Sequence, residues 1–227
     1  MKPLLFLAAD PRECKPFVTH WTGVEPVAMP VHWARRGTWK SRPVLAIANG
    51  AGPERARMAV EAAAGAFGLN GVCNIGFCGA LDTSLGIGDV FVATNVNGLP
   101  TLLPGSRPQS KSGALASIPR IAQTAAEKAE LRSGGAWVVE MEAAGALGAT
   151  VELGVGFYCI RAVSDLADED FSIDFNYFLM QDGRFDTFRL VCSSLMRPKC
   201  FRELIRLSKR TRAASINLGE FLDHCDF

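Results

Sequence analysis

Cysteine pairs at disulfide or metal-binding spacing are missing from this sequence. The seven cysteines are scattered, and no two of them form a Cys-x-x-Cys pair. An odd number without paired spacing argues against a disulfide framework and a zinc knuckle, and is typical of a reducing compartment. The three histidines, His20, His32 and His224, are too far apart along the chain to predict a metal site by spacing. We therefore expect a cytoplasmic protein that binds no metal.

Long apolar runs and a strong net charge are missing as well. No segment approaches the roughly 20 apolar residues of a membrane span. The N-terminal MKPLLFLAADPRE has an apolar run of about six residues, shorter than a signal-peptide core, and we interpret it as a first buried strand. The net charge of +1 gives no global attraction to nucleic acid or acidic membranes. We expect neither nucleic-acid binding nor stable membrane insertion.

Familiar cofactor and nucleophile motifs are absent or incomplete. The sequence has no Walker A segment and no GxSxG elbow of a serine hydrolase. Asn49–Arg55, NGAGPER, resembles the start of a dinucleotide fingerprint, but Arg55 stands where the third glycine is required. We expect no nicotinamide cofactor.

Apolar segments alternate with helical patterns along the chain. With 48% hydrophobic and 21% charged residues, 227 residues can bury a sizeable core. The predicted strands cover 4–8, 27–35, 43–48, 71–75, 89–96, 136–139 and 156–163. The predicted helices cover 53–67, 124–132, 142–153 and 199–224, with a turn at Arg36-Gly37 and a loop over 97–116. Because the strands are apolar runs, we expect one α/β domain, residues 1–227, with a central sheet covered by helices on both faces.

The C-terminal part, about 170–227, is predicted to be mostly helical. Residues 197–212 hold seven basic residues and one acid, whereas residues 165–186 hold seven acids and one base. We interpret the basic helix face as solvated surface, and the alternative is attraction to anionic lipid headgroups. The apolar residues of the last helix are expected to face inward: Phe201, Leu204, Ile205, Ile216, Phe221 and Leu222.

Three unusual segments fall where predicted strands end, namely Gly76–Leu81, Glu140–Glu142 and Arg161–Asp165. Capping and the helix dipole explain acidic residues at a helix start. They do not readily explain glycines, carboxylates and an arginine gathered at three strand ends. Because ligands in α/β sheets bind beyond the carboxyl ends of strands, these segments predict a binding site.

Three stretches carry a family resemblance: NIGFCGALDTSLGIGDVFVAT (Asn74–Thr94), VVEMEAAG (Val138–Gly145) and IRAVSDLAD (Ile160–Asp168). In this order and spacing they resemble the nucleoside phosphorylase/nucleosidase superfamily, which contains purine nucleoside phosphorylases and methylthioadenosine/S-adenosylhomocysteine nucleosidases. The resemblance runs over about residues 2–168 and implies a mixed, twisted central sheet flanked by helices. RIAQTAAEKAEL and MQDGRF are similar to the narrower hopanoid-associated phosphorylase-like subgroup, and futalosine hydrolases are a neighbour of similar size.

The resemblance implies cleavage of the bond between a purine and ribose. Asp165 matches the family aspartate that protonates purine N7, and Ser164 could orient it. An acid of this kind must carry its proton when the bond breaks, so we expect it in a buried site. The alternative for Asp165 is an N-cap of a helix after Leu166.

The resemblance also implies that residues of VVEMEAAG bind the ribose. Glu142 matches the glutamate that accepts hydrogen bonds from the ribose 2′- and 3′-hydroxyls, with its charge near a sugar becoming positive. Met141 would supply an apolar wall under the ribose. For Glu140 the sequence does not distinguish between three roles: a helix cap, a contact that supports the site, and a contact with the ligand.

Attack on the sugar is assigned to two further residues. Glu13, in AADPREC, lies about where nucleosidases carry an acid that activates water, with Asp10 as a competitor and an exposed charge as the alternative. Arg161 matches an arginine near that water. It needs a partner at the end of a buried strand, for which Glu13 is a candidate, and a purely structural ion pair is the alternative.

Phe77 departs from the family pattern. Many members have serine or another small polar residue here, in a glycine-rich loop that begins in this chain at Gly76 and holds phosphate or water. Phenylalanine puts a phosphate site in doubt and favours hydrolysis. The glycines of this loop can aim backbone amides at a ligand or simply form a tight turn.

The sequence thus predicts a purine nucleosidase that releases adenine from a 5′-modified nucleoside, without a cofactor. The same-class alternative is a phosphorylase that uses inorganic phosphate as co-substrate. The alternative of another class is a non-catalytic nucleoside-binding module, which Phe77 favours and the pair Glu142 and Asp165 disfavours. The resemblance also implies a homo-oligomer, a dimer or higher.

Overall fold

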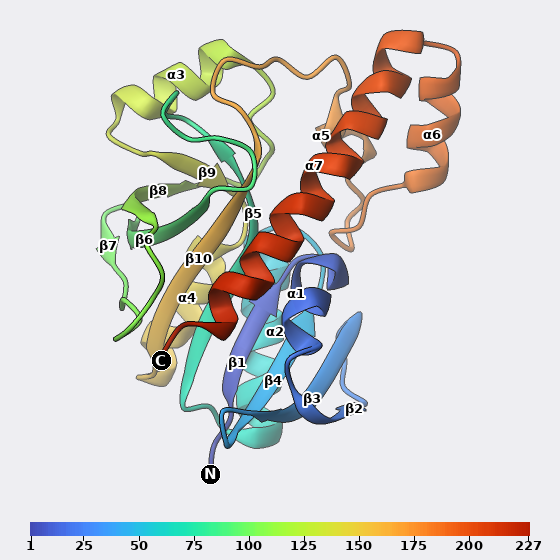
Figure 1. Ribbon diagram of the computed structural model, residues 1–227. Helices are drawn as coiled ribbons and strands as arrows, with labels where there is room; N and C mark the ends of the chain where they lie inside the picture. Colours follow the sequence, from blue (N-terminus) through green and yellow to red (C-terminus); the bar gives the residue numbers. More distant parts are fainter.

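A computed structural model describes residues 1–227 as a mixed α/β protein with one large sheet (Figure 1). The strands are β1 (Leu4–Ala8), β2 (Thr22–Pro26), β3 (Trp33–Trp39), β4 (Arg42–Ala48), β5 (Gly71–Ala80), β6 (Val90–Val96), β7 (Leu99–Pro100), β8 (Lys111–Ser117), β9 (Val138–Glu140) and β10 (Gly156–Asp165). The helices are α1 (Pro11–Val18), α2 (Pro53–Phe67), α3 (Ala125–Ser133), α4 (Ala143–Leu153), α5 (Phe175–Phe178), α6 (Thr187–Leu195) and α7 (Pro198–Asp223). The predicted α/β class with a mixed sheet flanked by helices is confirmed.

The sheet has the strand order β10-β6-β8-β9-β5-β1-β4-β3-β2. An additional pairing joins β10 to β5, so that β5, β9, β8, β6 and β10 close into a ring at one end of the sheet. β5 is parallel to both β1 and β10, whereas it runs antiparallel to β9. The ends of β9 and β10 therefore meet the second half of β5, and the three segments predicted to form a site come together there.

Helices cover both faces of the sheet, as the apolar strands predict. One face packs against α2 and α4 in a cluster of 26 buried residues, and the other packs against α1 and α7 in a cluster of 19. In Figure 1, α1 and α7 cross in front of the sheet and α2 and α4 lie behind it. No helix in the structure is both long enough and apolar enough to cross a bilayer.

The predicted strand at 27–35 and the turn predicted after it are wrong, whereas the first strand, 4–8, has the predicted bounds. Residues 27–35 do not form one strand, because β2 ends at Pro26 and β3 begins only at Trp33. The hairpin turn lies at Lys40-Ser41, which both have positive φ angles, instead of at Arg36-Gly37. Position 37 is a glycine because a Cβ there would come within 3.1 Å of the Thr22 carbonyl oxygen on the neighbouring strand. The glycine thus marks a close approach of two strands.

Two predicted loops are partly strand. The segment 97–116 contains β7 and most of β8, which pairs in parallel with β6 and β9. The segment Gly76–Ala80, expected to be a glycine-rich loop, continues β5 by pairing with β10 and then β9. In the sequence, glycine and small residues predict a turn here. In the structure, the neighbouring strands β10 and β9 supply the hydrogen bonds that keep this backbone extended.

The C-terminal part is helical, as predicted, but the inward set of its last helix is only partly correct. Phe221 and Leu222 are buried and Leu204 is partly buried, whereas Phe201, Ile205 and Ile216 are 40%, 44% and 43% exposed. The second half of α7 packs on α1 and the sheet, but its first half extends past the sheet beside α6 (Figure 1). Helical periodicity predicts which residues share one face of a helix. It does not predict whether another element covers that face.

Candidate functional site

Arg161, on β10, is a buried cation at the centre of the candidate site. Its side chain is 1% exposed, and Nη2 donates hydrogen bonds to Glu140 Oε2 and to Asn74 Oδ1. Glu142 Oε2 lies 4.0 Å from the same nitrogen. The direct partner of Arg161 is thus Glu140 and not Glu13, which the sequence offered as a candidate partner. Arg161 Nε is buried and has no hydrogen-bond partner in the protein.

Glu140, the last residue of β9, caps α4. Its carboxylate accepts hydrogen bonds from the backbone N–H of Glu142 and Ala143 at 3.0 Å, and it also binds Arg161. Strand β9 thus ends in a side chain that satisfies free donors at the start of the next helix and pairs with the buried guanidinium. Both oxygens of Glu140 are used by the protein itself.

Glu142 occupies the N-cap position of α4 but makes no capping hydrogen bond with its side chain. Instead, Oε1 accepts from the Gly52 N–H at 3.0 Å, across 90 residues of sequence. Burial, reinforced by the negative charge of Glu140, raises the pKa of Glu142 to about 8. Of the two carboxylates in VVEMEAAG, Glu140 caps the helix and Glu142 does not. Met141, between them, is also buried.

Glu13 completes the group of acids and is buried, not an exposed charge. Glu13 Oε2 accepts from the N–H groups of Ala9 and Asp10, and Oε1 accepts from the Phe77 N–H at 2.9 Å. Burial raises its pKa above the usual value. Asp10, the competing candidate, is the N-cap of α1. Although burial opposes it, hydrogen bonds from Arg12 hold the pKa of Asp10 below its usual value.

Gly76 is where Glu13 and Arg161 approach one another. A Cβ at this position would lie 2.8 Å from Glu13 Oε1 and 2.8 Å from Arg161 Nη1. The glycine therefore leaves space between a buried carboxylate and a buried guanidinium. The Phe77 ring packs, partly exposed, against the core cluster under α1 and α7, so this residue contributes its N–H to Glu13 and its ring to the core.

Asp165 ends β10 and lies in a second buried group. Ser164 Oγ donates to Asp165 Oδ1 at 2.8 Å, and Lys128 Nζ lies 2.6 Å from Asp165 Oδ2. No helix starts after Leu166, since the next helix is α5 at Phe175, so the capping alternative for Asp165 is wrong. Gly79 gives the carboxylate room, because a Cβ there would lie 2.8 Å from Oδ2.

Lys128, on α3, was not singled out from the sequence. Its side chain is fully buried, and besides Asp165 its ammonium donates to the Leu166 carbonyl at 2.7 Å and lies over the Phe171 ring. In the sequence this lysine sits among exposed helix charges in TAAEKAEL, and only its pairing with Asp165, 37 residues away, distinguishes it. Asn74 and Gly52 are the other site contacts that were missed, and both act through positions distant in sequence.

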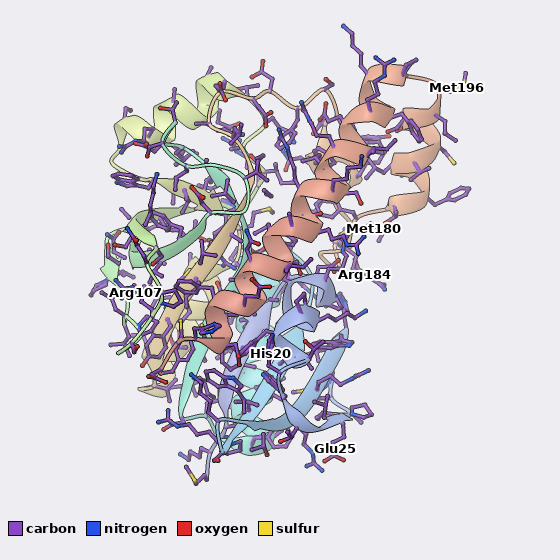
Figure 2. The ribbon with its side chains drawn as sticks, in the orientation of Figure 1. His20, Glu25, Arg107, Met180, Arg184 and Met196 are labelled. Carbon is purple, nitrogen blue, oxygen red and sulfur yellow. The ribbon has the colours of Figure 1, made fainter.

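Two turns border Glu142. The turn at Gly50–Gly52 leads into α2 and carries the N–H that binds Glu142. The segment around Gly183 closes on this turn, since Ala51 N donates to the Gly183 carbonyl at 2.7 Å and a Cβ at Gly50 would lie 2.5 Å from the Asp182 carbonyl oxygen. The C-terminal part thus touches the rim of the site close to Met180 and Arg184, where it meets the body of the protein (Figure 2).

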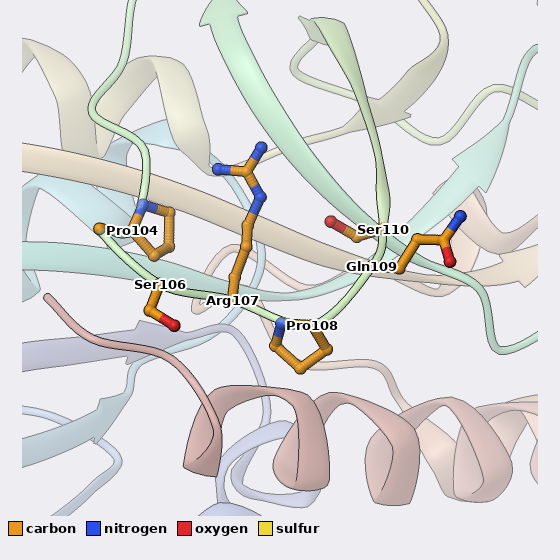
Figure 3. A pocket seen from close by; sticks show the side chains of 7 residues that line it. Pro104, Ser106, Arg107, Pro108, Gln109 and Ser110 are labelled. Atoms are coloured by element: carbon orange, nitrogen blue, oxygen red, sulfur yellow. The ribbon is translucent and has the colours of Figure 1, made fainter.

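A separate cavity of about 460 Å³ lies in the loop that precedes β8 (Figure 3). It contains one charged side chain, Arg107, and no carboxylate or residue of the groups described above. It offers no acid, base or buried partner for a reaction. Its lining is Pro104, Gly105, Ser106, Arg107, Pro108, Gln109 and Ser110. Nowhere in the chain do three or more His, Cys, Asp or Glu side chains form a group that could hold a metal ion.

Comparisons with known proteins bear on the family and on the fold. Residues 3–111 match a family model described as the phosphorylase superfamily. No curated relative matches the sequence significantly. Among solved structures, a 5′-methylthioadenosine/S-adenosylhomocysteine nucleosidase from S. pneumoniae, with a transition-state inhibitor, superposes with a TM-score of 0.73 at 17% identity, covering 98% of this chain and 97% of that one.

Two further structures give the same result. The corresponding nucleosidase from Neisseria meningitidis, in complex with methylthio-immucillin-A, has a TM-score of 0.73 at 19% identity over 99% of this chain and 98% of the other. The futalosine hydrolase of Helicobacter pylori has a TM-score of 0.71 at 18% identity over 98% and 96%.

These matches confirm the resemblance to the nucleoside phosphorylase/nucleosidase superfamily that the three sequence stretches predict. The chain has the fold of these nucleosidases over 98–99% of its length. Family model and fold together support an enzyme that breaks a glycosidic bond, as a hydrolase or a phosphorylase.

Proposed function

We propose that this protein is a purine nucleosidase that cleaves the N-glycosidic bond of an adenine-type, 5′-modified nucleoside by attack of water. The observation that carries the proposal is the buried group of Glu13, Glu140 and Glu142 around Arg161, whose Nε has no partner in the protein. A buried donor without a partner is costly, and a water molecule held beside it would satisfy it.

Glu13 is the proposed base and Arg161 the residue that orients the attacking water. The raised pKa of Glu13 suits a group that takes a proton from water near neutral pH. The three backbone N–H groups that bind Glu13 hold its carboxylate beside the space at Gly76. The water oxygen bonds to the anomeric carbon, its proton passes to Glu13, and the electrons of the broken C–N bond leave with the purine.

Glu142 is proposed to accept hydrogen bonds from the ribose 2′- and 3′-hydroxyls, above an apolar wall formed by Met141. Only Oε1 has a hydrogen bond from the protein, from Gly52, so Oε2 is available to the sugar. Positive charge developing on the ribose favours the ionised form of Glu142 and is stabilised by it. Glu140 positions Arg161 and the start of α4 and does not contact the sugar in this proposal.

Asp165 is proposed to pass a proton to purine N7 as the base leaves. Ser164 holds one carboxylate oxygen and Lys128 the other, which fixes the orientation of the group. An adenine-type base is favoured because a carboxyl can accept from the exocyclic amine and donate to N7 at the same edge of the ring.

Water is favoured over phosphate by the charge of the site. Three carboxyl groups surround a single guanidinium, and Glu140 already occupies the latter. A phosphate anion placed here would have to compete with Glu140 for this guanidinium, which is unfavourable. Phe77 also supplies no hydroxyl for a phosphate oxygen.

The test is release of purine base from a panel of 5′-modified adenine and hypoxanthine nucleosides, followed by chromatography with and without phosphate. Release of adenine without phosphate, with a free sugar product, is the expected result. Release that requires phosphate, with a sugar 1-phosphate product, would establish the phosphorylase instead. Tight binding of a nucleoside without turnover at any pH would identify a binding module and overturn the proposal.

A further inference from the structure

Large hydrophobic side chains are exposed on the hairpin of α6 and the first half of α7. Phe188, Val191 and Leu195 are 79%, 39% and 61% exposed and lie on one face of α6, three and four residues apart. Met196, 86% exposed, stands at the outer tip of the hairpin, away from the sheet (Figure 2). The first turns of α7 add Phe201 and Ile205. Large apolar side chains exposed together on one hairpin point to an interaction site.

The hairpin buries little hydrophobic surface against the rest of the protein. Its own core is a cluster of three buried residues, Ile173, Leu190 and Cys200. On the hairpin, the exposed large apolar side chains outnumber the buried ones. This arrangement is typical of an element that completes its packing against something else.

The same hairpin carries a strong positive charge. From Thr187 to Arg212 the chain has eight basic residues and one acid, Glu203, which is buried and binds the Ser172 N–H. Within that stretch Arg189 pairs with Asp186, while Arg206 and Arg210 pair with Glu169. The basic residues without a carboxylate partner within 4.0 Å are Arg197, Lys199, Arg202, Lys209 and Arg212.

Apolar and basic side chains occupy adjoining stripes of α7. Phe201 and Ile205 lie one turn apart, and Arg202, Arg206 and Lys209 follow the neighbouring row. The rest of the chain is acidic: it carries a net charge of −6, because residues 187–212 carry +7 and the whole chain carries +1. The hairpin is thus a local basic and apolar surface on an otherwise acidic molecule.

Charge decides between the possible partners. A symmetric contact with a second copy through this face would bring two equally basic surfaces together, which is unfavourable. A nucleic acid would supply negative charge but no apolar phase for Phe188, Leu195 and Met196. An anionic lipid bilayer supplies both, with headgroups for the lysines and arginines and an acyl boundary for the exposed hydrophobic residues.

We propose that the α6–α7 hairpin docks the protein on the surface of an anionic lipid bilayer, with Phe188, Leu195 and Met196 entering the headgroup region and Lys199 and Arg202 contacting lipid phosphates. The docking is peripheral, since no helix of the chain could span a bilayer. It leaves the candidate site intact, because none of these residues contributes to it.

The test is co-sedimentation of the full chain with sucrose-loaded phosphatidylcholine vesicles, prepared with and without phosphatidylglycerol. Binding is expected only with phosphatidylglycerol and is expected to weaken as salt is raised. Lys199→Glu/Arg202→Glu and Leu195→Ser/Met196→Ser are each expected to weaken it about tenfold or more.

Matched control variants change the same chemistry elsewhere on the surface. Lys2→Glu/Lys15→Glu makes the same charge change, and Leu99→Ser/Leu102→Ser removes two other exposed leucines. Both are expected to bind vesicles like the unaltered protein. The proposal is overturned if the anionic vesicles sediment none of the protein, or if the serine variant of the hairpin binds them undiminished. Concentration-dependent self-association that both hairpin variants abolish, without vesicle binding, would also overturn it and assign the face to a second copy.

Discussion

Asp165 is the residue whose replacement discriminates most clearly between an enzyme and a binding protein. Asp165→Asn keeps the size of the side chain and an oxygen that can accept the hydrogen bond from Ser164 Oγ, but it cannot donate a carboxyl proton. We expect kcat/KM for base release to fall by about 10²- to 10⁴-fold, with binding of adenine retained. Steady-state base release and a calorimetric titration measure the two effects. Asp168→Asn, an exposed position three residues on, is the matched control and is expected to leave both unchanged.

Lys128 affects Asp165 through their ion pair. Without the ammonium, Asp165 Oδ2 loses the contact that orients the carboxyl, so Lys128→Met is expected to lower kcat/KM for base release by about tenfold or more. Glu130→Gln, an exposed charge on the same helix, serves as control. An unchanged kcat/KM in a folded variant would mean that Lys128 is only structural.

Glu142 links the site to the pH dependence of stability. Its pKa is about 8 in the folded chain against a usual 4.5, so between these values the folded state binds a proton that the unfolded state has lost. The contribution of Glu142 to the free energy of unfolding therefore falls as pH rises through this range, by about 1 kcal/mol per pH unit. Glu142→Gln is expected to flatten that slope in urea unfolding at several pH values between 5 and 8. An unchanged slope would mean that a group other than Glu142 causes the pH dependence of stability in this range.

Helices α2 and α4 must pack closely for Gly52 to reach Glu142, and a glycine makes that contact possible. A Cβ at Gly145 would lie 2.5 Å from the Pro53 carbonyl carbon. Although alanine is the better helix former, Gly145→Ala is expected to destabilise the protein by about 1–3 kcal/mol through overpacking, and to weaken nucleoside binding.

Gly65→Ala supplies the control on α2, since nothing lies within 4 Å of its Cβ position. There the substitution is expected to stabilise by about 0.5–1 kcal/mol. Thermal unfolding of the two variants measures both effects, and a stabilised Gly145→Ala would contradict the close contact of the helices.

The two ends of the chain are held together by aromatic packing. Phe227 contacts the rings of Phe6, Trp39 and Tyr158, with centroids 5.1–6.1 Å apart, and thereby ties the end of α7 to the sheet. Phe227→Ala is expected to lower the free energy of unfolding by about 2–3 kcal/mol, since the ring is only partly buried. Phe188→Ala, on the exposed hairpin, is expected to change it by less than about 0.5 kcal/mol. Equal effects in denaturant unfolding would contradict this account.

The arrangement of the whole molecule was predicted where the sequence pattern is long and uniform. The helix Pro53–Phe67 has the predicted bounds, because Pro53 and the alanine-rich run define it locally. The strand at Lys111–Ser117 was missed because glycine and serine give it little β propensity, and its two parallel neighbours stabilise it instead. The exposure of Phe201 and Ile205 was missed because helical periodicity does not reveal whether another element covers that face.

The sequence by itself determined the alternation of strands and helices, the family resemblance and the identity of the candidate residues, because these depend on short stretches such as VVEMEAAG and IRAVSDLAD. Only the tertiary structure decided how those residues are paired. Arg161 binds Glu140, Asp165 binds Lys128 and Glu142 binds the Gly52 N–H, in pairs separated by 21, 37 and 90 residues. The physical reason is that the ionic and hydrogen-bond energies of buried groups depend on distance in space, which strand order and helix packing set and local sequence does not.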